Sequence, residues 1–79
     1  MAPQLVRVRQ LLAQRENFID VLEASFDDKE KLMHHTQLQL SRKEIQEFHT
    51  RIEKAENEGE KGLEDIVHIH AELLNKYLT

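Results

Sequence analysis

Apolar residues recur at a seven-residue interval along the first half of the chain. The series consists of Leu5, Leu12, Ile19, Phe26, Met33 and Leu40. Seven residues correspond to about two turns of an α-helix, so residues with this spacing lie on one side of it. The pattern predicts a long amphipathic helix over residues 4–35.

A second apolar series with the same interval occupies the rest of the chain, shifted by two positions. It consists of Leu38, Ile45, Ile52, Gly59, Ile66 and Leu73, with Phe48, Ala55, Gly62 and Ile69 at three-residue offsets. One straight helix cannot present both series to the same neighbour. We therefore expect the chain to break, bend or change partner between Met33 and Ser41.

A second helix is predicted to start at Ser41. Ser41 and Glu44 have the spacing of a capping box, in which two residues satisfy free backbone N–H groups at a helix start. The segment contains neither glycine nor proline, so a bend without a helix boundary is the alternative. A further cap-like cluster, from Ser25 to Asp28, interrupts no heptad and carries less weight.

The clearest interruption of the helical pattern is the segment 56–62, which holds both glycines of the chain. Each glycine costs about 1 kcal/mol in a helix relative to alanine. Glu56 and Glu60 would also repel each other at four-residue spacing. The segment therefore predicts a loop between helices over residues 41–57 and 63–78. The alternative is a helix that continues through the glycines as a poorly packed stretch.

The width of the apolar stripe indicates the fold class. Leu11 and Phe18 extend the stripe beyond the first series, as in a helix that touches two neighbours. Arg15 and Lys29 fall at seam positions, where a cation weakens a two-stranded coiled coil. We predict one all-α domain over residues 1–79, built from long amphipathic helices as a hairpin, three-helix bundle or coiled coil. Because only 39% of the 79 residues are hydrophobic and 5% are aromatic, the core is small and self-association is expected.

Composition and charge exclude several classes of protein. The chain has no cysteine, which excludes disulfide frameworks and cysteine-based zinc sites. The longest apolar run is Leu11 to Ala13, so the sequence predicts no membrane-spanning segment. A net charge of −4 makes nucleic acid an unfavourable partner. The absence of cysteine favours a cytoplasmic location, with the nucleus as an alternative.

Neither metal binding nor catalysis is predicted. The histidines are His34, His35, His49, His68 and His70. Adjacent residues on a helix, such as His34 and His35, point about 100° apart, and residues two apart, such as His68 and His70, point about 200° apart. Neither pair can therefore share a metal ion from one helix. The two serines have the sequence context of helix caps rather than of nucleophiles, and the glycines lack the spacing of a phosphate-binding loop. We expect no catalytic residue, no cofactor and no metal.

The function favoured by these observations is protein–protein interaction, as a coiled-coil or bundle module that oligomerises, scaffolds or tethers. The expected partner is a second copy of the chain or another helical protein. The predicted contact residues are Leu5, Leu12, Ile19, Phe26, Met33, Ile45, Phe48, Ile52, Ile66 and Leu73. The same residues could instead form an internal core. The alternative function is a small regulatory helical protein that binds RNA or a regulatory enzyme through a polar helix face.

Overall fold

The computed structural model describes residues 3–77 as three helices. They are α1 (Pro3–Ser25), α2 (Asp28–Asn57) and α3 (Glu60–Tyr77). The described residues contain no strand, which confirms the predicted all-α fold. The predicted end of the last helix at residue 78 lies outside the described residues.

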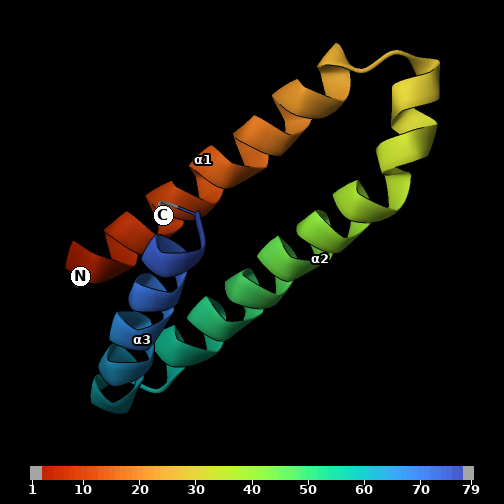
Figure 1. Ribbon diagram of the computed structural model, residues 1–79. Coiled ribbons are helices and arrows are strands. Elements are labelled where there is room, and N and C mark those ends of the chain that lie inside the picture. Colours follow the sequence, from red (N-terminus) through yellow and green to blue (C-terminus); the bar gives the residue numbers. More distant parts are fainter. Residues whose placement is uncertain (1–2, 78–79) are drawn as a thin grey trace.

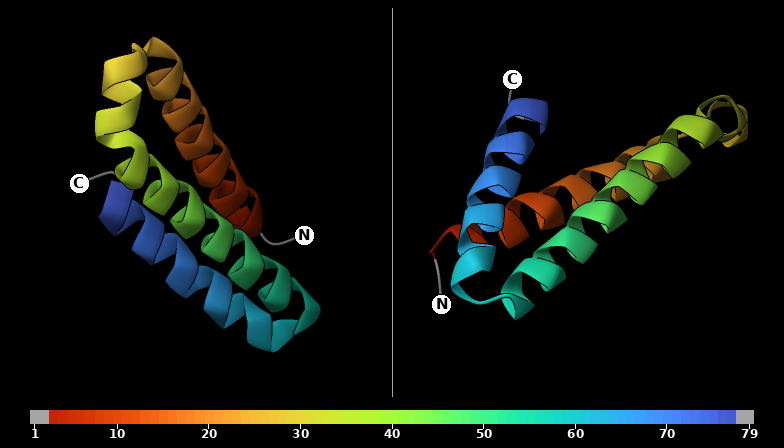
Figure 2. Two further views of the ribbon diagram at one scale, coloured as in Figure 1. Left: turned by 90° about the vertical axis from the view of Figure 1, so that its right-hand side faces the viewer. Right: turned by 90° about the horizontal axis from the view of Figure 1, so that it is seen from below.

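The three helices form an elongated bundle in which α3 covers only part of an antiparallel hairpin. Helices α1 and α2 make the hairpin, and α3 packs against both beside the end that carries the N-terminus (Figure 1). Helix α2 has 30 residues and α3 has 18, which correspond to lengths of about 45 and 27 Å. The far end of the hairpin therefore projects beyond α3, as both views of Figure 2 show. The overall dimensions are 48 × 19 × 18 Å.

The boundary between the first two helices lies at Phe26 and Asp27, not between residues 35 and 41. Asp27 caps α2: its carboxylate accepts from the Glu30 backbone N–H at 2.8 Å, and Glu30 accepts from the Asp27 N–H at 3.2 Å. The capping box therefore exists, but it starts at Asp27 rather than at Ser41, which is inside α2. Aspartate caps a helix as well as serine does, so the two segments compete on nearly equal terms.

Helix α2 runs without interruption through the predicted break. Figure 1 shows its first turns at an angle to the remainder, which is the predicted bend. The shift between the two apolar series has a simple cause: Leu38 packs in the core, whereas Met33 and Leu40 are exposed. The change of phase thus marks a change in which side of the helix is covered.

The chain turns within the predicted 56–62 segment, although the loop is shorter than expected. Helix α2 ends at Asn57 and α3 begins at Glu60 rather than at residue 63. Gly59 has φ +64°, a left-handed conformation that glycine adopts without steric cost. Gly62 lies inside α3, where an added Cβ would fall 1.7 Å from the Ala55 carbonyl oxygen. One glycine therefore allows the turn and the other allows α2 and α3 to pack closely.

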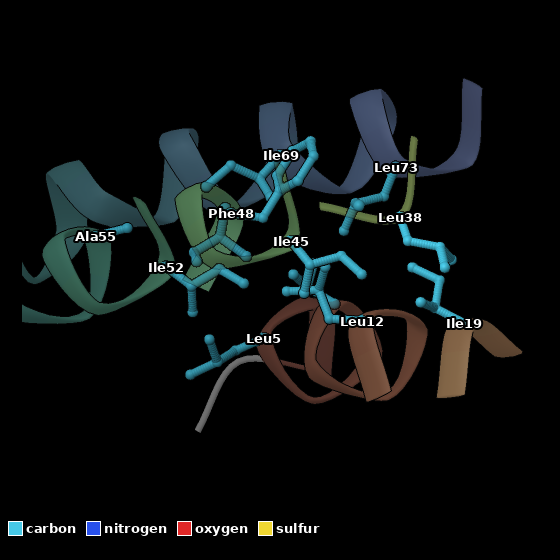
Figure 3. Close-up of a cluster of buried hydrophobic side chains, with 12 residues drawn as sticks. Leu5, Leu12, Ile19, Leu38, Ile45, Phe48, Ile52, Ala55, Ile69 and Leu73 are labelled. Carbon is cyan, nitrogen blue, oxygen red and sulfur yellow. The ribbon is translucent and has the colours of Figure 1, made fainter. Parts of the chain in front are cut away.

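The core is a single cluster of aliphatic side chains and one phenylalanine, contributed by all three helices (Figure 3). It consists of Leu5, Val8, Leu12, Ile19, Leu38, Ile45, Phe48, Ile52, Ala55, Ile66, Ile69 and Leu73. Each fully buried leucine or isoleucine contributes about 1.5–3 kcal/mol to folding. Most of this cluster lies where α3 covers the hairpin, so that end holds most of the packing energy.

Candidate functional site

The structure places most of the predicted contact residues inside the folded chain. Eight of the ten are buried in the core: Leu5, Leu12, Ile19, Ile45, Phe48, Ile52, Ile66 and Leu73. Phe26 is half-buried at the hairpin end, and Met33 is exposed. The alternative interpretation, an internal core, accounts for the eight buried residues. A contact surface must therefore be sought among the residues that the three helices leave exposed.

One group of exposed apolar residues lies on the part of the hairpin that α3 leaves uncovered. We call Phe18, Leu22, Met33 and Leu40 the open face. Their side chains are 55%, 36%, 68% and 57% exposed, respectively. They come from the end of α1 and the beginning of α2. Helix α3 packs on one side of the hairpin that α1 and α2 form, and we call this side the α3 track. The four residues lie on its continuation beyond the end of α3.

The α1 side of this track is defined by contacts with the end of α3. The Arg15 guanidinium lies over the Tyr77 ring of α3, with Cζ 4.7 Å from the ring centroid. Leu22 follows Arg15 by seven residues and therefore lies on the same side of α1. Phe18 lines a cleft of about 310 Å³ together with Arg15 and Tyr77. Phe18 and Leu22 thus continue the surface that α3 covers closer to the beginning of α1.

The α2 side of the track is defined in the same way. Leu40 lines a cleft of about 560 Å³ together with Glu72 and Lys76 of α3. Met33 precedes Leu40 by seven residues and lies on the same side of α2. Gln37 lines the same cleft, so the middle of the α2 side is polar but uncharged.

A group of charged and aromatic side chains marks the place where α3 ends. We call Arg15, Glu44, Lys76 and Tyr77 the α3-end cluster. The Tyr77 hydroxyl donates a hydrogen bond to Glu44 Oε1, and Lys76 Nζ lies 3.0 Å from Glu44 Oε2. The hydrogen bond from Tyr77 and then the bond from Lys76 lower the pKa of Glu44. Burial, followed by the bond to Glu44, raises the pKa of Tyr77 to about 12. The cluster fixes the last turn of α3 on the hairpin.

Arg15 is the member of the cluster whose charge meets aromatic rings. Its guanidinium lies between two rings, 5.3 Å from the Phe18 centroid and 4.7 Å from that of Tyr77. Its buried Nε–H has no hydrogen-bond partner within residues 3–77. Cation–π contacts hold the charge without neutralising it. The inner end of the open face therefore carries Arg15 and Lys76 together with the Glu44 carboxylate.

The opposite flank of the hairpin is charged rather than apolar, and ion pairs between α1 and α2 cross it. Arg42 bonds Asp20 at 2.9 Å and Glu23 at 3.3 Å, and the bond to Asp20 is the main reason that the pKa of Arg42 is raised. Farther along, His49 Nε2 lies 2.7 Å from Glu16 Oε1. The charges on this flank are thus largely satisfied within the chain.

The loop end of the hairpin is closed by a ring contact. The Phe26 and His34 rings stack at a centroid distance of 4.9 Å, and Phe26 also packs against the core. Glu30, which belongs to the capping box, lies seven residues before Gln37 on the same side of α2. Lys29 precedes Met33 by four residues, so the loop end of the open face is bordered by charges of both signs.

Other exposed apolar residues lie apart from the open face. Val21 and Leu32, which are 60% and 81% exposed, are one position away from Leu22 and Met33 and so point about 100° from them. On α3, the residues Leu63, Val67 and Leu74 form a separate stripe. Isolated exposed apolar residues such as Val21 and Leu32 are common on protein surfaces, so they carry less weight than grouped ones.

The described residues offer no arrangement for metal chemistry. No group of three or more histidine, cysteine, aspartate or glutamate side chains within residues 3–77 could hold a metal ion. Across the same residues, no helix combines the length and apolar character needed to cross a lipid bilayer.

Comparisons with known proteins add nothing to this picture. No protein-family model, no curated protein and no solved structure matches the chain.

Proposed function

We propose that the chain is a protein–protein interaction module without catalytic activity, and that it binds its partner through the open face. The observation that carries the proposal is the group of apolar side chains on the hairpin end that α3 leaves uncovered. The module would serve oligomerisation, scaffolding or tethering. The cysteine-free sequence fits a reducing compartment such as the cytoplasm.

The composition of the open face supports this proposal. Aromatic residues and methionine are enriched at protein interfaces, whereas charged residues are depleted at their centres. The open face has Phe18 at one end, Met33 near the other, and the uncharged Gln37 between its α2 residues. The flexible side chain of methionine also adapts to different partner surfaces.

The position of the open face supports one binding mode, in which a partner helix packs beyond the end of α3. Helix α3 already packs against α1 and α2 on the same side of the hairpin, at the end where α1 begins. A partner helix on the open face would extend the three-helix packing along the rest of the hairpin. We expect such a partner to bury its apolar side against the hairpin as α3 does.

The alternative function, RNA binding, has weaker support. Several cations that could meet phosphates are already paired with carboxylates: Arg9 with Glu56, Arg42 with Asp20, and Arg51 with Glu72 at 2.6 Å. Because these pairs would have to break, the binding free energy gained from phosphate contacts would be smaller. No observation favours this function over protein binding.

Site-specific photo-crosslinking in cells that express the chain tests the proposal. A photoreactive residue at Leu22 should give a discrete protein adduct, and Phe18→Ser in the same chain should reduce its yield severalfold. The matched control carries the photoreactive residue at Leu32, which is more exposed but lies off the open face. Equal adduct patterns from positions 22 and 32, or a pattern unchanged by Phe18→Ser, would contradict the proposal.

A further inference from the structure

We propose that the surface formed jointly by α1 and α3 binds a second copy of this chain, with the two-fold axis parallel to these helices. We call this surface the α1/α3 face. It meets the open face only at Phe18, so the proposal goes beyond the proposed function and is tested with residues that the open face does not contain. Such a contact uses one surface patch twice, which is the usual arrangement in homodimers.

No ion pair crosses the α1/α3 face within residues 3–77, which distinguishes it from the other two sides of the bundle. Ion pairs such as Arg42 with Asp20 join α1 to α2. Others, such as Arg51 with Glu72, join α2 to α3. On those two sides charged side chains pair within the chain, whereas the α1/α3 face is largely apolar.

Two stripes of side chains make up the α1/α3 face. Each stripe alternates spacings of three and four residues, which places its members on one side of a helix. The stripes consist of Arg7, Leu11, Gln14 and Phe18 on α1, and of Glu60, Leu63, Val67, His70 and Leu74 on α3. The side chains of Phe18, Leu63, Val67 and Leu74 are between 37% and 55% exposed. Contiguous exposed apolar side chains are typical of binding surfaces.

Contacts between α1 and α3 place both stripes along one seam. Leu5 and Leu63 line one cavity at the beginning of the seam, and Phe18 and Tyr77 line the cleft of about 310 Å³ at its end. The rise from Leu5 to Phe18 is about 20 Å, and that from Leu63 to Tyr77 is about 21 Å. The two helices therefore point the same way, and their residues stay level along the whole face.

The α1 side of the face carries only positive charge. Arg7 is exposed and forms no ion pair within the described residues. The carboxylates of α1 bond side chains of α2 instead, and they are Glu16, Asp20 and Glu23. No carboxylate of α1 therefore lies beside Arg7 on this face.

The α3 side of the face carries the opposite charge. Glu60 begins the α3 stripe and Glu64 borders it one turn later, and neither forms an ion pair within residues 3–77. The two lysines of α3 lie on its α2 side: Lys76 bonds a carboxylate of α2, and Lys61 is one turn before Asp65, which lines a cavity with α2. The charges are thus sorted by helix.

A two-fold axis parallel to the helices makes the α1/α3 face complementary to itself. It places α1 of each copy on α3 of the other, with the levels kept. Arg7 then meets Glu64 of the other copy, because Arg7 lies just beyond Leu5 and Glu64 just beyond Leu63. The ion pair forms twice, and no like charges are brought together.

The apolar residues of the face match in the same arrangement. Phe18 of one copy lies level with Leu74 of the other, and Leu11 lies level with the segment between Val67 and His70. An axis at right angles to the helices would place α3 on α3 in the opposite direction. Glu60 would then face apolar side chains without a cation, so charge selects the parallel order.

The size of the face is that of a reversible contact. It is as long as α3, about 27 Å, and two helices wide, about 18 Å. A flat footprint of these dimensions is about 500 Å² on each copy and about 1,000 Å² in total, which is the lower end for a specific interface. We expect a dissociation constant in the micromolar range or weaker.

Charge exchange tests the proposed contact, with the purified full chain studied by sedimentation equilibrium at low salt. Arg7→Glu should weaken dimerisation about tenfold, and so should Glu60→Arg combined with Glu64→Arg, because like charges then meet at both sites. An equimolar mixture of the two variants should restore dimerisation to within a few-fold of wild type. Recovery on mixing cannot arise from a folding defect. A mixture as weak as its components, or a wild-type chain that is monomeric at millimolar concentration, would overturn the proposal.

Two valines supply a matched pair for the apolar part. Val67 and Val6 are 50% and 41% exposed, but Val6 lies three residues before Arg9, on the side of α1 that faces α2. Val67→Asp should weaken dimerisation about tenfold or more, whereas Val6→Asp should leave it unchanged within about twofold. Equal effects would show that the α1/α3 face is not the contact.

Disulfide trapping tests the orientation, because the natural sequence contains no cysteine. Gln14 and Ala71 lie at nearly the same level on α1 and α3. Under mild oxidation, a mixture of Gln14→Cys and Ala71→Cys chains should form the mixed dimer about tenfold faster than either variant forms a dimer with itself. Faster self-linking of the Gln14→Cys chain would place α1 on α1 and overturn the parallel dimer.

Discussion

The two ends of the hairpin use the same two helices but differ in what covers them. At one end, α3 closes the bundle over core residues such as Leu12 and Ile52, which are fully buried. At the other end, the seam between α1 and α2 is still buried at Ile19 and Leu38, but the side that α3 would cover if it were longer carries Phe18, Leu22, Met33 and Leu40, which remain exposed. A helical stripe becomes core or surface according to whether a third helix reaches it. The length of α3 is therefore the feature that creates the candidate binding surface.

The largest expected difference between the two ends concerns stability. Leu12→Ala at the covered end should lower the free energy of unfolding by about 2–5 kcal/mol, because it leaves a cavity in the core. Leu22→Ala at the open end should lower it by less than about 1 kcal/mol, because its side chain is 36% exposed. Urea denaturation followed by circular dichroism at low protein concentration measures both. Equal losses would show that the open end is packed even in the monomer.

The next effect tests the junction between α2 and α3. Gly62→Ala should lower the free energy of unfolding by about 1–3 kcal/mol, because its new methyl group would collide with the Ala55 carbonyl. Gly59→Ala should also destabilise, by about 1–2 kcal/mol, but through its positive φ rather than through a collision.

A second substitution at each glycine separates the two causes. Asparagine tolerates the left-handed conformation, so Gly59→Asn should be milder than Gly59→Ala. Gly62→Asn should be at least as damaging as Gly62→Ala. A rise in melting temperature for Gly59→Ala combined with Gly62→Ala would instead indicate a helix that runs through the segment without a turn.

A smaller effect distinguishes the observed helix start from the one that the sequence favoured. Asp27→Ala removes the cap of α2 and should lower the free energy of unfolding by about 0.5–2 kcal/mol. Ser41→Ala lies inside α2 and should be neutral or slightly stabilising, because alanine is the better helix former. Thermal melts of the two variants give the comparison. The reverse ranking would place the helix boundary at Ser41.

The sequence allowed the fold class to be predicted, but not the boundary between the first two helices. Heptads and the scarcity of helix breakers were enough to indicate a helical hairpin or bundle. The first apolar series runs past the true boundary, because Phe26 and Met33 keep the seven-residue interval on opposite sides of it. Periodicity reports which side of a helix is apolar, not which neighbour covers it. The spacing of Asp27 and Glu30 was the available signal for the actual start of α2.

The candidate site was predictable only in part. Phe18 stood out as a member of a broad stripe and Met33 was a predicted contact residue, but the sequence assigned most contact residues to positions that the folded chain buries. Finding the open face requires knowing that α3 has 18 residues and packs beside the opposite end of the hairpin. That knowledge depends on which helices pack together, and the apolar pattern leaves this open.

The smallest expected effect concerns the α3-end cluster, which joins the covered end to the open end. Tyr77→Phe removes the hydroxyl that bonds Glu44 but keeps the ring beneath Arg15. The loss in the free energy of unfolding at neutral pH should be about 1 kcal/mol or less.

The pH dependence of this loss is more informative. Because folding raises the pKa of Tyr77 from 10.0 to about 12, the folded state favours the protonated phenol. This contribution is complete below pH 10 and is lost as the pH rises toward 12. The wild-type chain should therefore lose its stability advantage over Tyr77→Phe across that interval, as measured by urea denaturation at a series of pH values. On the acid side, the lowered pKa of Glu44 stabilises the folded state above the ordinary pKa of 4.5, and this contribution disappears as the pH falls. A constant difference between the two proteins from neutral pH to pH 12 would mean that the Tyr77 hydroxyl is neither buried nor bonded to Glu44 in solution, and that Tyr77 contributes to the packing of α3 through its ring alone.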